Sequence, residues 1–278
     1  MTKINNARVL ELKKKAKEIR VEIIKMIYKS QSGHPGGSLS AADIVTALYF
    51  EILNIDPNRP NWEERDRFIL SKGHACPVWY VCLAEKGFFP KENLAKLRKI
   101  GGILQGHPDM CKVPGLDMTT GSLGQGLSAG VGMALGAKTK GLQFKTYVML
   151  GDGEINEGQV WEAAMSANKF KLNNLIAMID YNNLQLDGQC NEVMPIEPLA
   201  DKWQSFGWDV KEIDGHNMHE ILTVFYDLKK QQENPTIIIA HTIKGKGVSY
   251  MENQLNWHGK APNEEQFQQA MKELEVGK

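Results

Sequence analysis

The chain has 278 residues, of which 42% are hydrophobic, a content typical of a folded protein with a buried core rather than a disordered one. Lysine plus arginine and aspartate plus glutamate number 33 each, so no net charge favours nucleic acid or an anionic membrane. The four cysteines lack Cys-x-x-Cys spacing, the N-terminus is too charged for a signal peptide, and no apolar run approaches the ~20 residues of a membrane span. We therefore expect a cytoplasmic protein that binds small molecules or other proteins.

The first third of the chain predicts two helices and a strand. Apolar residues recur at steps of three and four from Leu12 to Ile27 among lysines and glutamates, which indicates an amphipathic helix ending near "SQSGHPGG". A second helix is expected from Ser40 ("SAADIVTALYFEIL") to the turn "NIDPNRPNW". In "RDRFILSKGH" a short apolar strand stands directly before a Gly-His pair.

The remainder of the chain alternates helices and strands. The glycine-rich stretch "SLGQGLSAGVGMALGAKTK" predicts a helix that another element approaches closely, because glycine is otherwise costly in a helix. Then follow "TYVML" as a strand, "EGQVWEAAMSANKF" as a helix, "NLIAMID" and "GWDVKEID" as strands, "MHEILTVFYDLKK" as a helix and "PTIIIAHTI" as a strand. This order predicts an α/β fold with a doubly wound, mostly parallel sheet and helices on both faces. No linker or repeat interrupts it, so we expect residues 1–278 to form a single domain.

Two polar residues follow neighbouring predicted strands. Asp152 lies between two glycines, and one of them, Gly151, separates it from "TYVML". Asn182 follows Asp152 by thirty residues and is separated from "NLIAMID" by a single residue. Ligands bind beyond the carboxyl ends of such strands, and the helix after Gly153 points its N-terminus at the same place. Carboxylate and amide oxygens suit Mg²⁺ or Ca²⁺ rather than Zn²⁺. The pattern predicts a metal and a diphosphate, whereas an isolated G-D-G is more often a helix cap followed by a turn.

Histidines follow glycines more often than chance predicts. Four of the seven histidines do so, although 26 glycines among 278 residues would place fewer than one there: His34, His74, His107 and His216. Tight turns thus present imidazoles whose pKa values, if near neutrality, suit proton transfer. For any one of them a structural role remains the alternative, and His216, in "IDGHN", is interpreted as a helix-capping turn. His219 and His241 are assigned no function.

The stretch from Gly151 to Asn183 resembles the diphosphate-binding signature of thiamine diphosphate enzymes, in which G-D-G precedes N or N-N at this spacing. Five further segments each resemble a landmark of the transketolase family, in the family's order: "SGHPGGSLS", "SKGHAC", "QGHPDM", "TTGSLGQG" and "WHGKAP". The resemblance covers essentially the whole chain. It implies the thiamine diphosphate-binding fold, and within it the diphosphate domain.

The resemblance also implies a set of cofactor ligands. Asp152, the side-chain oxygen of Asn182 and the backbone carbonyl of Leu184 would bind Mg²⁺, with Ca²⁺ as the alternative. The amide of Gly153 would contact the diphosphate of thiamine diphosphate, and Gly124 would lie beside it in a wall of the cleft.

Histidine roles and an interface are implied in the same way. Three histidines would line the substrate funnel and handle hydroxyl protons: His34, His107 and His258. His74 would lie beside the cofactor, and His258 would also contact the diphosphate. Glu157 and Glu162, five residues apart on one predicted helix, would lie at an interface between subunits, although from the sequence pattern alone they are solvated helix-face carboxylates.

The implied function is that of the N-terminal subunit of a two-subunit transketolase, which moves a two-carbon ketol unit from a ketose phosphate to an aldose phosphate. Complete transketolases carry a pyrimidine-binding domain with an activating glutamate in the same chain. Here a second polypeptide is expected to supply that domain, and the chain alone is expected to be inactive. We also expect two copies of the chain to form a dimer within a heterotetramer.

Three alternatives stay open at this level. One is the alpha subunit of a 2-oxo acid dehydrogenase. The segments "SGHPGG" and "WHGKAP" argue against it, because they suit sugars rather than lipoyl acceptors. A second is a deoxyxylulose phosphate synthase-like enzyme, whose full domain set is missing, and a third is a non-catalytic protein that kept the cofactor-binding fold. Nucleotide enzymes are excluded because no P-loop occurs and "GSLGQG" has the wrong spacing for a dinucleotide fingerprint.

Overall fold

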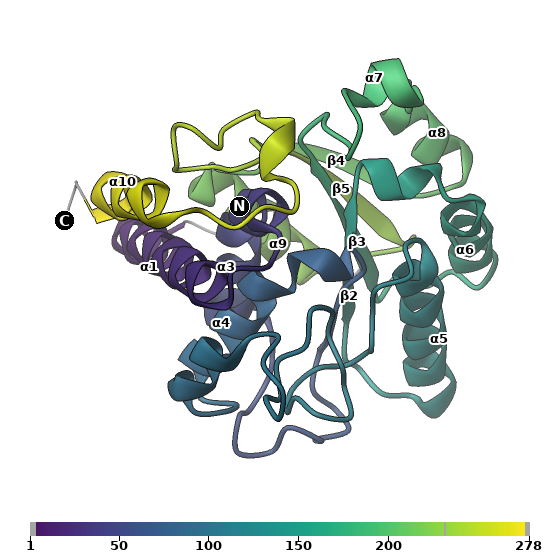
Figure 1. Cartoon of the computed structure of the whole chain (residues 1–278). Helices are drawn as coiled ribbons and strands as arrows, with labels where there is room; N and C mark the ends of the chain where they lie inside the picture. Colours follow the sequence, from purple (N-terminus) through teal and green to yellow (C-terminus); the bar gives the residue numbers. More distant parts are fainter. Residues whose placement is uncertain (1–3, 231, 276–278) are drawn as a thin grey trace.

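A computed structural model of the chain describes residues 4–230 and 232–275 (Figure 1). At its centre is a five-stranded sheet with strand order β1-β2-β3-β5-β4, in which every neighbouring pair is parallel. The strands are β1 (Arg67–Leu70), β2 (Thr146–Gly151), β3 (Leu175–Tyr181), β4 (Asp209–Asp214) and β5 (Thr236–His241). All five predicted strands are present, and the predicted α/β fold is confirmed.

Helices cover both faces of the sheet (Figure 1). One layer contains α1 (Asn6–Ser30), α3 (Ala42–Ala47), α4 (Cys76–Lys86), α9 (Met218–Leu228) and α10 (Glu264–Glu275), and the other contains α5 (Gln125–Lys140), α6 (Gly158–Lys169) and α8 (Leu199–Ser205). Successive strand residues point to opposite faces, so Met149 belongs to the first hydrophobic core and Val148 and Leu150 to the second. This explains why the strands are apolar without alternation.

Short elements complete the chain. They are α2 (Pro35–Ser40), the π-helical turn η1 (Leu48–Ile52), the 3₁₀ turns η2 (Gly73–Ala75), η3 (Lys91–Lys96), η4 (Gly153–Asn156) and η5 (Leu255–Trp257), and α7 (Cys190–Val193). The second predicted helix corresponds to α3 and η1 together. In the described part of the chain, no helix has the length and apolar character needed to cross a membrane.

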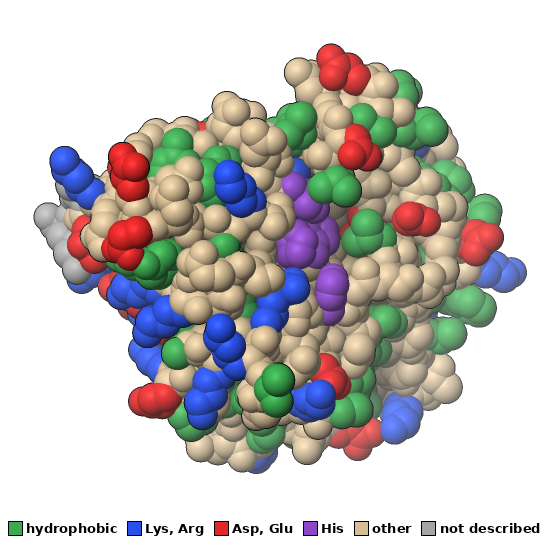
Figure 2. Space-filling model, in the orientation of Figure 1, with side chains coloured by type: hydrophobic (Ala, Val, Ile, Leu, Met, Phe, Trp, Pro, Cys, Tyr) green, Lys and Arg blue, Asp and Glu red, His purple; other side chains and the backbone are tan. Residues whose placement is uncertain are grey.

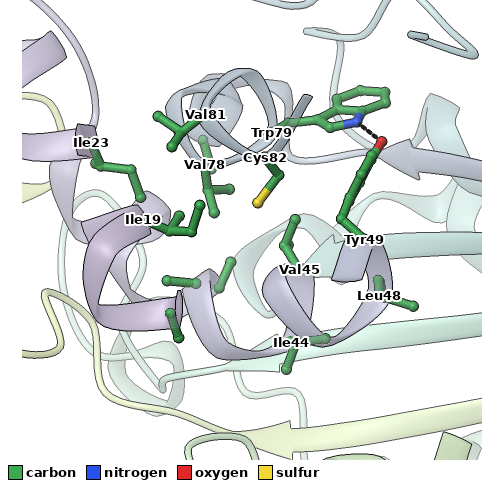
Figure 3. Close-up of a cluster of buried hydrophobic side chains, with 14 of the residues drawn as sticks. Ile19, Ile23, Ile44, Val45, Leu48, Tyr49, Val78, Trp79, Val81 and Cys82 are labelled. Carbon is green, nitrogen blue, oxygen red and sulfur yellow. Dashed lines mark hydrogen bonds between the residues drawn. The ribbon is translucent and has the colours of Figure 1, made fainter. Parts of the chain in front are cut away.

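Part of the larger hydrophobic core lies between α1, α3 and α4. Figure 3 shows Ile19 and Ile23 of α1 facing Val78 and its neighbours on α4, with Val45 of α3 below them. The predicted apolar face of α1 is buried as expected. In contrast, the sequence analysis did not predict α2, α4, α7, α8 and α10. Helix α4 is buried nearly all round, so "CPVWYVCLAEK" has no amphipathic period to read.

The glycines of α5 divide into two groups. A Cβ at Gly130 would lie 2.5 Å from Val148 Cγ2 of β2, and one at Gly126 would overlap Ser71, so these two glycines permit close contact between helix and sheet. Gly132 and Gly136 face open space. The predicted close approach is therefore confirmed for one side of the helix, which begins at Gln125 rather than at the start of the glycine-rich stretch.

Candidate active site

The carboxyl ends of β2 and β3 bring Asp152 and Asn182 together. The two strands pair in register with Gly151 opposite Asp180. Asp152 Oδ2 accepts the backbone N–H of Asn182 at 2.9 Å and that of Asn183 at 2.6 Å, and its Oδ1 accepts the N–H of Gly153 at 2.8 Å. One carboxylate therefore ties together the two loops that the sequence pattern placed at the same edge.

A cavity of about 220 Å³ opens at this edge. Its lining includes both loops, two lysines and two histidines: Asp152, Gly153, Asn182, Lys72, Lys244, His74 and His258. Figure 2 shows histidine side chains gathered in a hollow near the middle of one face of the molecule. The cavity thus combines oxygen ligands, backbone amides, ammonium groups and imidazoles.

No residue in the described part of the chain forms an ion pair with the carboxyl group of Asp152, although the nearby charge of Lys244 favours its ionised form. Asp152 is 3% exposed, and its burial and the neighbouring charge of Asp180 raise its pKa to about 6, despite the amide hydrogen bonds from Gly153 and Asn183. A bound cation would lower this pKa and hold the group ionised.

The donor chemistry of this loop fits a hard cation. Besides the Asp152 carboxylate, it offers the amide oxygen of Asn182, which accepts only a long bond of 3.3 Å from the N–H of Leu184, and the carbonyl of Leu184. Asn183 Oδ1 and Gln185 Nε2 are buried with no hydrogen-bond partner among the described residues. The described part of the chain contains no cluster of three or more His, Cys, Asp or Glu able to hold a metal. A metal bound at this loop would therefore need amide and carbonyl oxygens as ligands in addition to the Asp152 carboxylate.

Three histidines from distant segments meet beside the cavity. His34 precedes α2, His74 lies in η2 and His258 follows η5, and their ring centroids lie 5.0–5.5 Å apart. The Nδ1 atoms of His34 and His258 are buried without a hydrogen-bond partner among the described residues. Polar ring atoms are therefore available to a ligand.

These three imidazoles are uncharged at neutral pH. Burial, followed by nearby positive groups, lowers the pKa of His34 to about 4 and that of His258 to about 3, and lowers the pKa of His74 well below its usual value. A pKa near neutrality, the condition under which an imidazole suits proton transfer, is not met by this trio. The sequence pattern indicated these histidines but not that Lys72 and Lys244 lie close to His74 and His258.

His107 stands apart from the trio. It is exposed and packs on Gly121, where a Cβ would lie 3.3 Å from its ring. Burial and the Arg98 charge lower its pKa. The buried Tyr80 hydroxyl donates toward the carbonyls of Gln105, at 3.0 Å, and His107, at 3.1 Å, and so fixes the loop that carries this histidine.

Two buried ion-pair partners escaped the sequence analysis. Asp180, fully buried in β3, pairs with Lys72 and accepts hydrogen bonds from Ser40 Oγ at 2.5 Å and from Thr242 Oγ1. Burial opposes ionisation of Asp180, but the Lys72 ammonium and these donors lower its pKa. No local pattern shows this pairing, because the partners are 108 residues apart in the chain.

Lys244 was missed as well. It follows β5 in a glycine-containing loop, and its Nζ donates to the carbonyl of Leu184 at 3.0 Å. Burial, with Lys72 nearby, lowers its pKa to about 8. The signal was present in "HTIKGKG", a charged residue beside glycine just after a strand, as at Asp152.

Glu154 is a third buried carboxylate at this edge. It accepts the N–H of Gly124 at 2.9 Å and of Gly151 at 3.0 Å, together with the hydroxyl of Ser71. Gly124 therefore lies just behind the cavity wall, which its neighbour Leu123 lines.

The two predicted interface glutamates are solvent-exposed. Glu157 is the N-cap of α6 and Glu162 lies within that helix. The structure thus places both on the outer surface, apart from the cavity lining.

Comparison with known proteins identifies the family. The family described as "Transketolase, thiamine diphosphate binding domain" matches residues 12–277. An apulose-4-phosphate transketolase subunit of Phocaeicola vulgatus is 46% identical over 92% of this chain and 90% of its own length. A 6-deoxy-6-sulfo-D-fructose transketolase subunit of Clostridium sp. is 48% identical over 96% of this chain and 97% of its own. The chain belongs to the transketolase family.

The coverage distinguishes two kinds of transketolase relative. The transketolase structure from Campylobacter jejuni superposes with a TM-score of 0.90 at 32% identity over 95% of this chain, but the chain spans only 42% of that protein. The subunit relatives are matched almost end to end. This chain is thus a thiamine diphosphate-binding, N-terminal-type transketolase subunit. That prediction is confirmed.

Proposed function

We propose that this subunit, with a second polypeptide, transfers a two-carbon ketol unit from a ketose phosphate to an aldose phosphate, using thiamine diphosphate and Mg²⁺. The observation that carries the proposal is the convergence of Asp152, Asn182 and the histidines on one cavity. The relatives are named for apulose-4-phosphate and 6-deoxy-6-sulfo-D-fructose, both sugars with an anionic group. A transketolase-type reaction on an anionic ketose is consistent with both names.

The proposed metal ligands are Asp152, the amide oxygen of Asn182 and the carbonyl of Leu184, with Ca²⁺ as the alternative ion. On this proposal the amide of Gly153 contacts the diphosphate, Gly124 supports the same wall, and Lys244 contributes its positive charge. When bound, thiamine diphosphate supplies the carbon nucleophile that allows a bond next to a ketose carbonyl to break.

The proposed catalytic histidines act on sugar hydroxyls. An uncharged imidazole has one hydrogen-bond donor and one acceptor, which can hold a sugar hydroxyl, and the lowered pKa values keep His34 and His258 in that form. We assign the solvent-exposed His107 to the substrate and His74, which lines the cavity, to the cofactor. His258, which lines the cavity, is assigned to both substrate and diphosphate.

We infer that the partner carries the pyrimidine-binding domain and the activating glutamate. Exposed Glu157 and Glu162 on α6 are assigned to a contact between two copies within a heterotetramer. Residues 1–278 are taken as one domain, since a single sheet underlies both helical layers. The cytoplasm is the proposed location, a reducing compartment that suits four unpaired cysteine thiols.

Calorimetric titration of thiamine diphosphate into the reconstituted complex tests the metal assignment. Asp152→Asn keeps the shape of the side chain but removes its charge, and we expect the Mg²⁺-dependent affinity to fall by at least about a hundredfold. Asp187→Asn, an exposed carboxylate on the same loop, is the matched control and should bind as the wild type. Equal affinity of the two variants would disprove the metal assignment.

Ketol transfer from a ketose phosphate, measured with and without the partner subunit, tests the reaction itself. We expect turnover only when both chains, thiamine diphosphate and Mg²⁺ are present. Tight cofactor binding by the complex without turnover of any ketose phosphate would instead support a non-catalytic cofactor-binding protein.

A further inference from the structure

His216 is a Gly-His histidine that the proposed reaction does not use. It lies between β4 and α9, and its side chain is 13% exposed. Its Nδ1 lies 2.8 Å from Asp43 Oδ2 of α3, and its Nε2 accepts the backbone N–H of Ile243 at 2.8 Å. The imidazole thus links one helix to the loop that follows β5.

The hydrogen bonds fix the tautomer of His216. A backbone amide only donates, so Nε2 must be unprotonated to accept from Ile243. In a neutral imidazole the proton then resides on Nδ1, which donates to the Asp43 carboxylate. The ring therefore has one donor and one acceptor, both used.

Arg20 continues this network on the other side of Asp43. Its guanidinium donates to both carboxylate oxygens, at 3.1 and 2.6 Å, and its Nε donates to the carbonyl of Lys246 at 3.1 Å. Burial would raise the pKa of Asp43, but Arg20 and the His216 hydrogen bond lower it to about 2. The buried Asp43 carboxylate is therefore ionised, and it accepts hydrogen bonds from both Arg20 and His216.

Both ends of the network reach the same loop. Ile243, held by His216, and Lys246, held by Arg20, flank Lys244 in sequence. Gly245 donates its N–H to the carbonyl of Gly36 at 3.0 Å and has a positive φ of 80°. Lys244 is 3% exposed, and without these anchors a flexible loop would let its buried ammonium return to water.

We propose that Arg20, Asp43 and His216 form a positioning network that fixes the loop 242–248 and so holds the Lys244 ammonium against the diphosphate end of the cavity. None of these three side chains is among the residues that line the cavity. The network acts through Lys244. That Lys244 faces a diphosphate rests on the proposed function, whereas the tautomer of His216 and the contacts of the loop do not.

The tautomer is tested by NMR on the cofactor-free chain labelled with ¹⁵N-histidine. Long-range ¹H–¹⁵N correlations should show His216 protonated at Nδ1 and unprotonated at Nε2 near neutral pH, with a protected Ile243 amide. A proton on Nε2, or rapid exchange of the Ile243 amide, would overturn the network whatever the function of the cavity.

The consequence for binding is tested with a pair of variants in the reconstituted complex. His216→Gln places an amide oxygen near the position of Nε2, whereas His216→Asn is too short to reach Ile243. We expect calorimetry with thiamine diphosphate and Mg²⁺ to show about tenfold weaker binding for His216→Asn and recovery to within about threefold for His216→Gln. His219→Asn, on exposed α9 surface, is the control.

The outcomes separate the two proposals. If the wild-type complex does not bind thiamine diphosphate, the proposed function fails while the NMR result still decides the network. If the wild type binds and His216→Asn binds equally tightly, the positioning network is disproved. A variant that loses stability in urea but keeps its affinity would likewise show a purely structural role.

Discussion

The neighbouring ends of β2 and β3 hold two buried carboxylates in opposite electrostatic states. Asp180, at the end of β3, has an ammonium and two hydroxyls as partners, and its pKa is lowered. Asp152, just after β2, receives backbone amides, and its pKa is raised to about 6. Amide hydrogen bonds alone do not offset burial beside a like charge. The pair at β3 carries its own cation, and the cation for Asp152 is the one that we propose to be Mg²⁺.

The largest effect is expected at Asp180, the internally neutralised carboxylate. Asp180→Asn leaves the ammonium of Lys72 buried without its counter-charge, which should lower the free energy of unfolding by about 3–5 kcal/mol in urea denaturation. The double variant Lys72→Met, Asp180→Asn removes both charges and should recover most of this loss. A single variant as stable as the wild type would contradict the contrast between the two strand ends.

In the metal-free chain, ionisation of Asp152 is expected to lower the free energy of unfolding, whereas the charge of Asp180 stabilises the fold. Folding raises the pKa of this group to about 6 from about 3.9 in an unfolded chain. Its stabilising contribution is therefore fully present below about pH 4 and is lost as the pH rises through 6.

Urea titrations across this pH range measure that contribution. Between pH 4 and pH 7 we expect the wild type to lose about 2 kcal/mol more of unfolding free energy than Asp152→Asn does. Thiamine diphosphate with Mg²⁺ should suppress the difference. Parallel stability curves for the two proteins would show that Asp152 is already ionised without a metal.

A smaller effect is expected from Thr242, a hydroxyl donor to Asp180. Thr242→Val conserves the shape of the side chain and removes one hydrogen bond to a charged group, so the unfolding free energy should fall by about 1.5 kcal/mol. Thr223→Val on the exposed surface of α9 is the matched control, with an expected change of less than about 0.5 kcal/mol. Equal effects would mean that hydroxyl donors add little at the end of β3.

The difference between the two carboxylates also explains what the sequence reveals. Asp152 and Asn182 lie at strand ends beside turn residues. The apolar strand segments and the alternation of strands and helices therefore suffice to predict that the two residues lie together. Asp180 sits inside an apolar strand, and its partner Lys72 lies in another motif, so only the folded chain shows their pairing. Local patterns locate ligands that face the cavity, whereas long-range charge pairing is invisible to them.

The same limit applies to the histidines and the helices. Gly-His turns pointed to His34 and His74, and the resemblance of "WHGKAP" pointed to His258; these three imidazoles do meet. Their lowered pKa values depend on burial beside charges such as Lys244, which comes from a loop after the last strand. Helix α4 escaped prediction for a related reason, because complete burial erases the periodicity that marks an amphipathic helix.

The register of β2 against β3 has a consequence for recognising distant relatives. Gly151 faces Asp180 across the ladder, so the offset between the two strand tips is set by backbone hydrogen bonds. The thirty-residue interval between Asp152 and Asn182, in contrast, is the combined length of η4, helix α6, strand β3 and their connections. A homologue whose helix gained a turn would keep the ligand geometry and lose the familiar count. Searches keyed to paired strand tips should therefore reach further than those keyed to spacing.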